Sequence, residues 1–595
     1  MTSPLVARAK YNKRPLNVLG GDRVDPDKLT RELSLIEGAL GFATSLVGTV
    51  FNALDYGVDP RGTGAQQDAF NRMLSEMSAG DVAYIPPSTS TTGYRVTDWI
   101  VLPKSGLTIV GGGWGSRITQ ATTDVGVFFA EDLDRLTVAN LQCYGPGLWS
   151  ASWTGNEGHD ERGIYFTNCT NVLVERVWVR NFGSAGIALR GSCSGVVRNA
   201  YVEGTNLLGT ALTASSNFQN GVFVTYGPAT EAWGRLRIES VDVTQVTQGI
   251  LVEKGAATGT GAVDIVAPRL YAIPGQHGIY CQSGNVTMTG VTAEDCELNG
   301  IKIQTGLSAV EDLTNVEVSG ANLVNCRGNA FEVSGLDDAY AIRNVRIEGM
   351  AMTNDRMLAV TGFVEGLTAT IRGGGSGGHG VFIGELSTPT RTPHDLDVTV
   401  DGETIGQHGV YVSTNASTNI RVRPNLIDCG QDTANTWDGV NVEGDTTGVT
   451  IFDPSLVNAN GSMRYGIFQT DAVGRTLVSG VTTITGTATD TIRGVGQLAW
   501  GPVTNTRASA AATTVTYADG LLLIDATGGA RTVTLLPAAY VVDRTYVVKK
   551  TDASANVVTV DPSGAETVDG AATYALAVQY QSVSVQSDGT TWWIT

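Results

Sequence analysis

A short apolar strand pattern recurs through the middle of the chain. In each copy a small residue precedes alternating apolar positions, as in GIYF at Gly163, GILV at Gly249 and GVYV at Gly409. The residues that open the copies, the anchors, are Gly163, Gly186, Gly221, Gly249, Gly278, Gly300, Ala330, Met357, Gly380, Gly409, Gly439 and Gly466. They are separated by 22 to 35 residues, and a near-regular period of this size predicts a solenoid, a propeller or another repeat array.

Each repeat has room for three short strands and for no ordinary helix. Asn171, Asn285 and Asn315 open an earlier strand 15 residues before an anchor, and a second apolar run such as 177–179 lies in between. Ankyrin, tetratricopeptide and most leucine-rich arrays need helices, and a propeller blade needs four strands over about 40 residues. The pattern therefore predicts an all-β chain, a right-handed parallel β-helix with a turn for each of the twelve anchors or more.

The corners of such a coil make special demands on the backbone. Asparagine tolerates the left-handed conformation, which favours corners at Asn171, Asn285 and Asn315. Glycine at the anchors is expected to supply a backbone angle that other residues resist. The variable spacing places insertions at the turns, where binding loops are commonly found.

A first amphipathic helix is expected in the N-terminal leader. It begins at the cap Asp25 and the proline Pro26, and its apolar stripe consists of Leu29, Leu33, Ile36 and Leu40. In a globular domain such a stripe packs on a core. Because residues 1–50 have little core of their own, packing against another chain is at least as well supported, and the leader is a candidate attachment segment.

A second helix, over residues 66–78, is expected to plug the open first turn of the coil, which any solenoid must cover. Its apolar residues are Phe70, Met73, Leu74 and Met77.

The pattern changes near residue 501. Residues 505–595 lack the anchor period and show alternating strands, with a hairpin predicted over 582–594 around the turn Asp588-Gly589. The expected organisation has four parts, which are an attachment leader (1–50), the first part of the β-helix with its capping helix (51–115), the main coil (116–500) and a C-terminal β domain (501–595).

The chain of 595 residues is acidic, with a net charge of −19 and a pI of about 4.7. This charge makes nucleic acid a poor partner and disfavours strongly anionic polysaccharides, unless local basic patches override the average field. No apolar signal region opens the chain, and no stretch approaches 18 apolar residues, so we expect synthesis in a cytoplasm and no membrane span. The seven cysteines lack close spacing and are expected to be buried, reduced thiols.

The segment that leads into the coil resembles the opening of the pectate-lyase-like superfamily. The similar residues are Asp55-Tyr56-Gly57, the helix over 66–78, the strand at 82–87 with its Pro-Pro end, Tyr94-Arg95-Val96 and the strand at 107–111. Ala65-Gln66-Gln67 replace the usual Asp-Asp before the helix. The resemblance covers residues 54–115 and, through the period, continues to about residue 495; it implies the same β-helix fold.

The C-terminal part resembles a β domain found in many phage tail fibres and tailspikes. The similar residues are the strands at 532–535 and 547–551, Glu566-Thr567-Val568-Asp569-Gly570 and the terminal stretch 587–592. The whole layout is similar to a bacteriophage tailspike, a receptor-binding protein of the virion tail. That resemblance implies a homotrimer, a leader over residues 1–50 that docks on a tail or baseplate protein, and a β-helix that binds host surface polysaccharide and often cleaves it.

The loop between Tyr144 and Gly163 is the first candidate site. Aromatic rings can stack on sugars, and glycoside cleavage usually needs two carboxylates about 5–10 Å apart. The candidates for carbohydrate binding are Trp149, Trp153 and His159, and those for catalysis are Glu157, Asp160 and Glu161. The alternative reading is a contact with a neighbouring subunit, with solvated charges.

A second candidate lies in the run 294–297. Strand alternation puts Glu294 and Cys296 on one face, and Asp295 and Glu297 on the other as an outward carboxylate pair, although solvated charges are the simpler reading. A polar cluster at Asp432, Trp437 and Asp438 could add a groove contact. The spacing of His379, His394 and His408 does not suggest a metal site, and we expect no cofactor or metal.

Three functions remain open on the sequence. The chain is a virion adhesin that only binds a surface glycan, a tailspike depolymerase acting as hydrolase or lyase, or a secreted bacterial polysaccharide lyase or glycoside hydrolase unconnected with a virion.

Overall fold

The computed structural model describes residues 48–595 except 124, 147–160, 205–218, 226–233, 254–260, 306–310, 338, 354, 385–390, 415–417, 444–446, 460, 470–474, 480–482, 495–496, 501–505 and 517–518. The helix expected within residues 25–40 lies outside this part of the chain. The described residues form two compact units, one within residues 48–202 and the other within residues 203–595.

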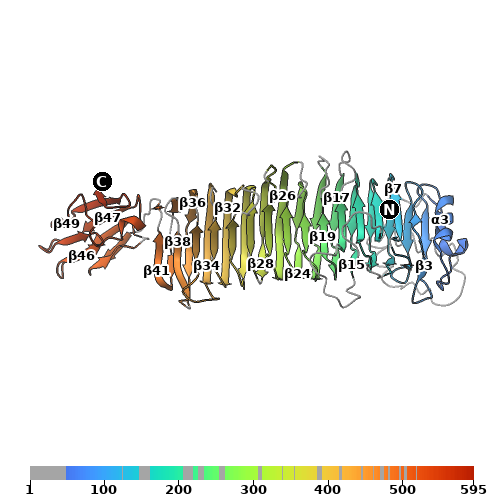
Figure 1. Ribbon diagram of the computed structural model, residues 1–595, viewed down its shortest axis with the longest axis horizontal. Helices are drawn as coiled ribbons and strands as arrows, with labels where there is room; N and C mark the ends of the chain where they lie inside the picture. Colours follow the sequence, from blue (N-terminus) through green and yellow to red (C-terminus); the bar gives the residue numbers. More distant parts are fainter. Residues whose placement is uncertain are drawn as a thin grey trace, which may run out of the picture. The chain divides into compact units, whose positions relative to one another are not determined.

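Both units contain a coil in which each turn adds one strand to each of three parallel columns, a, b and c (Figure 1). In the first unit, column a consists of β1 (Val50–Asn52), β2 (Val82–Ile85), β5 (Thr108–Gly111), β8 (Thr137–Ala139), β11 (Val172–Glu175) and β14 (Gly195–Arg198). Column b consists of β3 (Tyr94–Val96), β6 (Arg117–Gln120), β9 (Gln142–Tyr144) and β12 (Trp178–Arg180), and β15 (Tyr201–Glu203) begins at its end. Column c consists of β4 (Ile100–Val101), β7 (Phe128–Glu131), β10 (Arg162–Thr167) and β13 (Ala185–Arg190).

The second unit continues the same three-strand pattern. Columns a and b begin with β17 (Arg235–Glu239), β18 (Asp242–Thr244), β20 (Ala262–Val266), β21 (Arg269–Ile273), β23 (Val286–Thr289) and β24 (Thr292–Cys296). The long strands β26 (Leu313–Cys326), β28 (Ile342–Thr353), β30 (Val364–Gly374), β32 (His394–Ile405) and β34 (Ile420–Cys429) then span both columns. The columns separate again into β36 (Thr447–Phe452), β37 (Ser455–Val457), β39 (Arg475–Ser479), β40 (Thr483–Thr485) and β42 (Gln497–Trp500).

Column c of the second unit holds the predicted repeat. Its strands are β16 (Asn220–Thr225), β19 (Gln248–Val252), β22 (Ile279–Cys281), β25 (Ile301–Gln304), β27 (Phe331–Gly335), β29 (Leu358–Gly362), β31 (Val381–Gly384), β33 (Val410–Ser413), β35 (Val440–Glu443), β38 (Met463–Gln469) and β41 (Thr487–Gly494). The residue after each anchor pairs with its equivalent one turn later, as Ile279 does with Ile301 and Val410 with Val440. These stacked apolar residues form the buried core of the coil, and the predicted parallel β-helix is confirmed.

The role predicted for the anchor glycines is wrong. None of them has a left-handed φ angle. A Cβ atom at Gly278 would instead lie 2.6 Å from the carbonyl oxygen of Gly300, and one at Gly409 would lie 2.6 Å from that of Gly439. Glycine is therefore required by the close approach of successive turns, not by the backbone angle.

The corner asparagines behave as predicted. Asn171, Asn285 and Asn315 have φ angles of 53°, 55° and 60°, in the left-handed region. Asn315 Nδ2 donates a hydrogen bond of 3.0 Å to Asn285 Oδ1, and Asn344 Nδ2 donates one of 2.6 Å to Asn315 Oδ1. The asparagines thus form a ladder along the corner.

A second ladder, made by the residues that precede the anchors, explains several buried polar side chains. His277 Nδ1 accepts the backbone N–H of Asn299 at 3.3 Å, and Asn299 Oδ1 accepts that of Asn329 at 2.9 Å. Farther along, His408 Nδ1 accepts the backbone N–H of Asp438 at 2.9 Å. Each side chain accepts the backbone N–H of the equivalent residue in the next turn. Because His277 and His408 accept through Nδ1, both must be unprotonated at that atom.

The second predicted helix is confirmed as α3 (Gln67–Glu76), at the N-terminal end of the first unit's coil (Figure 1). It follows the 3₁₀ turn η1 (Ala53–Tyr56). Phe70, Met73, Leu74 and Met77 are each about 1% exposed, and the Phe70 ring meets Tyr94 edge-on at 6.0 Å. The apolar stripe of α3 therefore covers core side chains that would otherwise be exposed to water at this end of the coil.

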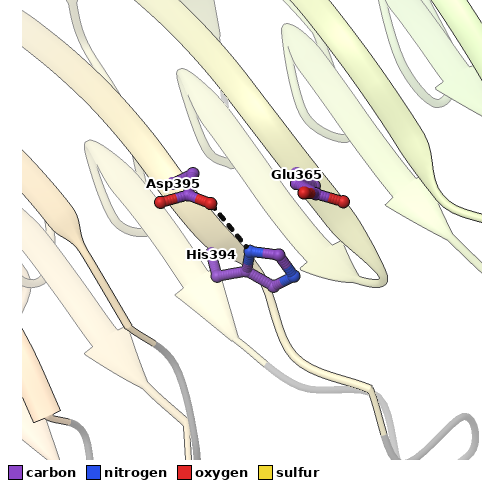
Figure 2. A group of neighbouring side chains, drawn as sticks. All are labelled: Glu365, His394 and Asp395. Carbon is purple, nitrogen blue, oxygen red and sulfur yellow. Dashed lines mark hydrogen bonds and ion pairs between the residues drawn. The ribbon is translucent and has the colours of Figure 1, made fainter.

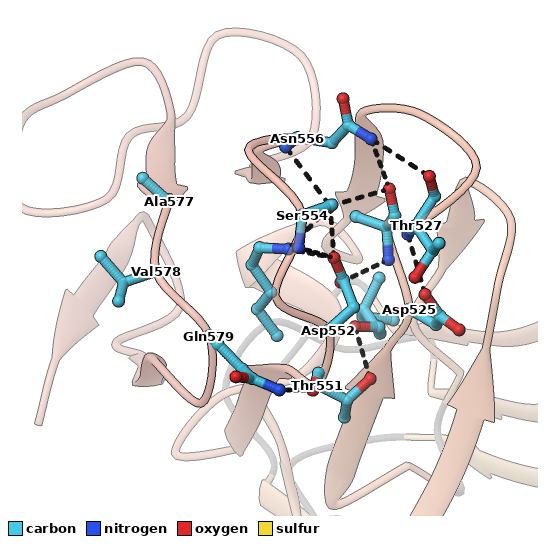
Figure 3. Close-up of polar contacts among 12 residues, drawn as sticks. Asp525, Thr527, Thr551, Asp552, Ser554, Asn556, Ala577, Val578 and Gln579 are labelled. Carbon is cyan, nitrogen blue, oxygen red and sulfur yellow. Dashed lines mark hydrogen bonds and ion pairs between the residues drawn. The ribbon is translucent and has the colours of Figure 1, made fainter.

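Residues 506–595 form two sheets. One contains β43 (Thr506–Ser509), β45 (Leu521–Ile524), β47 (Thr545–Lys550), β50 (Ser582–Ser587) and β51 (Trp592–Ile594), and the other β44 (Thr513–Thr514), β46 (Arg531–Thr534), β48 (Val558–Asp561) and β49 (Tyr574–Leu576), with the 3₁₀ turn η2 (Ala538–Tyr540) after β46. The predicted hairpin is confirmed, since Ser587 pairs with Trp592 in the antiparallel strands β50 and β51. Loops at one edge are joined by Asp552, whose Oδ2 accepts the Ala526 N–H at 2.6 Å, while Asn556 Nδ2 donates to the Ala526 carbonyl at 2.8 Å (Figure 3).

All seven cysteines are buried and free, as predicted. In the part of the chain that the structure describes, no helix is long and apolar enough to cross a membrane.

Candidate functional site

The outward side of column b in the first unit combines aromatic and basic residues. The side chains of Ile118, Cys143 and Val179 point into the core, so the residues that alternate with them point outward. The seven outward positions on β3, β6, β9 and β12 are Arg95, Arg117, Thr119, Gln142, Tyr144, Trp178 and Arg180. They include three arginines and no carboxylate. Together with Trp114 and Tyr201, we call them the basic aromatic face.

Three rings of this face lie in a row. Trp114, in the turn before β6, is 59% exposed, and its ring meets that of Trp178 at 5.0 Å with an interplanar angle of 61°. Trp178 in turn meets Tyr201 edge-on at 5.6 Å. The Nε1 atom of Trp178 is buried and has no hydrogen-bond partner among the described residues. Such a row offers apolar ring surface, as sugar-binding sites require.

Two of the arginines flank Tyr144. The guanidinium carbon of Arg117 lies 3.9 Å from the centre of the Tyr144 ring, and that of Arg180 lies 5.6 Å from the same centre. Burial lowers the pKa of Arg117 from its ordinary value, and the positive charge of Arg180 acts in the same direction. Both groups remain cationic, because a guanidinium does not lose its proton in proteins. The face can therefore stack a sugar ring and donate charged hydrogen bonds to its substituents.

Most residues of the first predicted site lie outside the described part of the chain. These are Trp149, Trp153, Glu157, His159 and Asp160. Glu161 is described and is 1% exposed, and its Oε2 accepts the backbone N–H of Gly183 at 3.1 Å. The catalytic and sugar-binding roles of these six residues stay predictions. Tyr144 of the basic aromatic face is the last residue of the strand before this loop.

The prediction that Glu294 and Cys296 lie on the same face of a strand is wrong. Asp295 has a φ of 55°, and this left-handed corner breaks the strand alternation, so Glu294 is exposed while Cys296 is buried. Asp295 Oδ1 accepts a hydrogen bond from Asn325, and Glu297 forms an ion pair of 2.9 Å with Arg327. Each carboxylate is thus joined to the next turn of the coil. Catalysis by Asp295 and Glu297 stays a prediction.

Among the described residues, one group of side chains could act as metal ligands (Figure 2). The spacing of the histidines in the sequence did not suggest this group. Glu365 on β30 and the neighbours His394 and Asp395 on β32 have ligand atoms within 4.8 Å of one another. Hydrogen bonds from Asn419 and His394 hold the pKa of Asp395 below its ordinary value. Because Arg343 forms an ion pair with Glu365, a cation would have to compete with that guanidinium. Within this group Glu365 is therefore already paired with Arg343, and Asp395 already accepts hydrogen bonds from Asn419 and His394.

The polar cluster at 432–438 has a structural role at its buried end. Asp438 is fully buried, and Arg464 donates to it through Nε at 2.9 Å and Nη2 at 2.7 Å. Trp437 meets His408 edge-on at 5.0 Å, and Asp432 is exposed. The cluster therefore braces the ladder that precedes the anchors, and a groove contact by Asp432 or Trp437 stays a prediction.

The basic aromatic face was missed in the sequence. Trp178 was noted only as part of an apolar run, and Arg117 and Arg180 were not singled out. The signal was present, because Arg117, Gln142 and Trp178 occupy equivalent positions in successive strands of column b. Finding it requires the alignment of turns of unequal length.

No family model matches the chain, and a search of curated proteins gave no match. Several solved structures are similar in fold. The catalytic unit of a GH87 α-1,3-glucanase from Streptomyces thermodiastaticus strain HF3-3 is 17% identical, with a TM-score of 0.42 over 60% of this chain and 69% of that one. The pre-mature gene product 12 of bacteriophage phi29 is 13% identical, with a TM-score of 0.42 over 91% and 69%.

The Dettilon tailspike protein (gp208) is 10% identical, with a TM-score of 0.40 over 77% of this chain and 75% of that one. What these proteins bind or cleave is their own property, so the function of this chain has to be argued from its own residues. Those residues establish a parallel β-helix with a small C-terminal β domain.

Proposed function

We propose that this protein is the receptor-binding tailspike of a bacteriophage and attaches the virion to a host surface polysaccharide. The basic aromatic face carries the proposal, because a row of three rings beside arginines matches the chemistry of a sugar chain. The β-helix, the resemblance of the C-terminal part to a β domain of tailspikes and the tailspike-like layout of the sequence support it. In this proposal the molecule is a homotrimer in the virion tail, and residues 1–50 dock it on a tail or baseplate protein.

The binding experiment uses the full chain and a panel of purified bacterial surface polysaccharides, with affinities from biolayer interferometry. We expect Trp114→Ala and Trp178→Ala each to weaken binding of the recognised polysaccharide by about tenfold, because each removes a stacking ring. Trp114 is 59% exposed, so its loss is not expected to disturb the fold.

Trp593→Ala is the matched control, since Trp593 is also an exposed tryptophan, at 49%, but lies in the C-terminal β domain. It should bind as the unmodified protein does. Unchanged affinity in both face variants would place the binding site elsewhere. A monomer in sedimentation would argue against the tailspike assembly.

Cleavage is the second part of the proposal, and the carboxylates predicted from the sequence, Glu157, Asp160 and Glu161, supply its acids. If the protein releases oligosaccharides from the recognised polysaccharide, Glu157→Ala or Asp160→Ala should abolish release while leaving binding intact. Reducing ends measured over time are the readout. Full activity in both variants would exclude the loop between Tyr144 and Gly163 as the catalytic site, and an intact polymer under all conditions would leave an adhesin without hydrolytic activity.

A further inference from the structure

The basic aromatic face contrasts with the charge of the molecule. The chain as a whole has 58 acidic and 39 basic residues apart from histidine. At the seven outward positions of β3, β6, β9 and β12, however, arginine occurs three times and neither aspartate nor glutamate occurs. The outward carboxylate on the next strand of column b is Glu203, on the same face of β15 as Tyr201. A local positive field in an acidic protein suits an anionic ligand, because the remaining surface repels such a ligand and this face attracts it.

Two of these arginines have no carboxylate partner. Neither Arg95 nor Arg117 forms an ion pair with any described residue, whereas Arg135, Arg176 and Arg198 of the first unit's coil do. Arg117 Nη1 donates to the carbonyl of Thr91 at 2.8 Å, and its Nε is buried without a hydrogen-bond partner among the described residues. No described carboxylate balances the charge of this half-buried guanidinium, so an anionic ligand beside it would be stabilised.

The cations and the rings are close enough to act on one saccharide. Arg180 lies 5.6 Å from the Trp178 ring as well as from the Tyr144 ring, and Arg117 lies 3.9 Å from the Tyr144 ring. Arg117, Gln142 and Trp178 stand in register on adjacent strands, and strands are about 4.8 Å apart. The rings and guanidiniums therefore span the width of one or two sugar units.

We infer that the basic aromatic face recognises a carboxylated polysaccharide, one whose repeating unit carries a uronic acid or a similar sugar carboxylate. The sugar ring stacks in the row of Trp114 and Trp178, and the carboxylate accepts hydrogen bonds from Arg117, with Arg95 contributing to the attraction. Guanidinium groups suit this task because their planar donors match a carboxylate in geometry and charge. This inference rests on the proposed function and adds the chemical class of its ligand.

The test uses the full chain and a panel of bacterial capsular and O-antigen polysaccharides, half of them carboxylated and half neutral. Each polysaccharide that binds is tested again after chemical reduction of its carboxyl groups to alcohols. We expect the protein to bind carboxylated members, and reduction to weaken that binding by at least about tenfold. Binding to neutral members, or equal binding after reduction, would overturn the inference and leave the adhesin proposal standing. Absence of binding to every member would overturn both.

Charge variants provide the second arm. Arg95→Gln and Arg117→Gln should each weaken binding of the carboxylated polymer several-fold and should not alter the residual binding of its reduced form. Arg61→Gln is the control for net charge, because Arg61 is 77% exposed and is paired with Asp59 at 3.0 Å. Arg95 is exposed, so its variant keeps the test valid even if Arg117→Gln fails to fold. Equal losses in all three variants, or none, would contradict the inference.

Discussion

Lowering the pH from about 6.5 to about 4 is expected to destabilise this protein strongly, through its buried histidines. Burial lowers the pKa of His277 to about 3, with the charge of Lys302 adding to the effect. Burial also lowers the pKa of His408 to about 3, with the neighbouring His379 and Arg464 acting in the same direction. For His379 itself, burial and the charge of Arg356 lower the pKa to about 4.

The direction of this change in the free energy of unfolding follows from the number of protons that the folded and unfolded states bind. An unfolded histidine titrates near 6.5, so between that value and the lowered pKa the unfolded chain binds protons that the folded chain does not. The free energy of unfolding then falls by up to about 1.4 kcal/mol per pH unit for each such histidine, and the loss is complete below the folded pKa. Carboxylates whose pKa is lowered, such as that of Asp395, lose their contribution only in more acid solution.

Equilibrium urea unfolding at several pH values between about 7 and about 4.5 measures this slope. The double variant His277→Asn/His408→Asn should flatten it, because asparagine does not titrate but keeps an acceptor for the next turn, as Asn299 shows. His394→Asn is the control, since His394 lies at the surface outside the ladder, with its side chain 29% exposed. An unchanged slope in the double variant would show that the buried histidines do not set the acid sensitivity.

Replacing an anchor glycine is expected to be the most damaging single substitution in the coil. A Cβ atom at Gly409 would lie 2.3 Å from Leu426 Cδ1, 2.6 Å from the Gly439 carbonyl oxygen and 2.9 Å from Cys429 Sγ. The carbonyl belongs to the next turn and cannot move without breaking the strand pairing of β33 with β35. Gly409→Val should therefore lower the free energy of unfolding by about 2–4 kcal/mol.

Gly461→Asn is a suitable control for Gly409→Val. Gly461 is exposed and left-handed, with a φ of 66° and no atom within 4 Å of a built Cβ, and asparagine tolerates that conformation. Its midpoint of urea unfolding should lie close to that of the unmodified protein. If Gly409→Val does the same, the turns are less closely packed at the anchors than the structure indicates.

The repeat made the fold accessible from the sequence. The apolar strands at the twelve anchors report a local requirement that recurs from turn to turn, and three asparagines at a fixed offset mark a corner of the coil. Both features stack in register in the structure. The helix with Phe70 and Met73 was equally accessible, because its apolar stripe has helical spacing.

Other inferences failed where the property was not local. The anchor glycines were assigned a backbone angle, whereas the actual constraint is a carbonyl oxygen in the next turn, about 30 residues away in the chain. The carboxylates of 294–297 were placed by strand alternation, which the left-handed corner at Asp295 interrupts.

The sequence by itself determined that the chain is a parallel β-helix of three short strands per turn. The reason is that the apolar strand pattern recurs along the chain and that asparagine marks a corner in several of the repeats. Only the tertiary structure decided which side chains meet on its surface. The turns differ in length from 22 to 35 residues, so Arg117, Tyr144 and Trp178 share no regular spacing, and the column register alone brings them onto one face. The basic aromatic face is a product of stacking, and its chemistry became visible only when the turns were aligned.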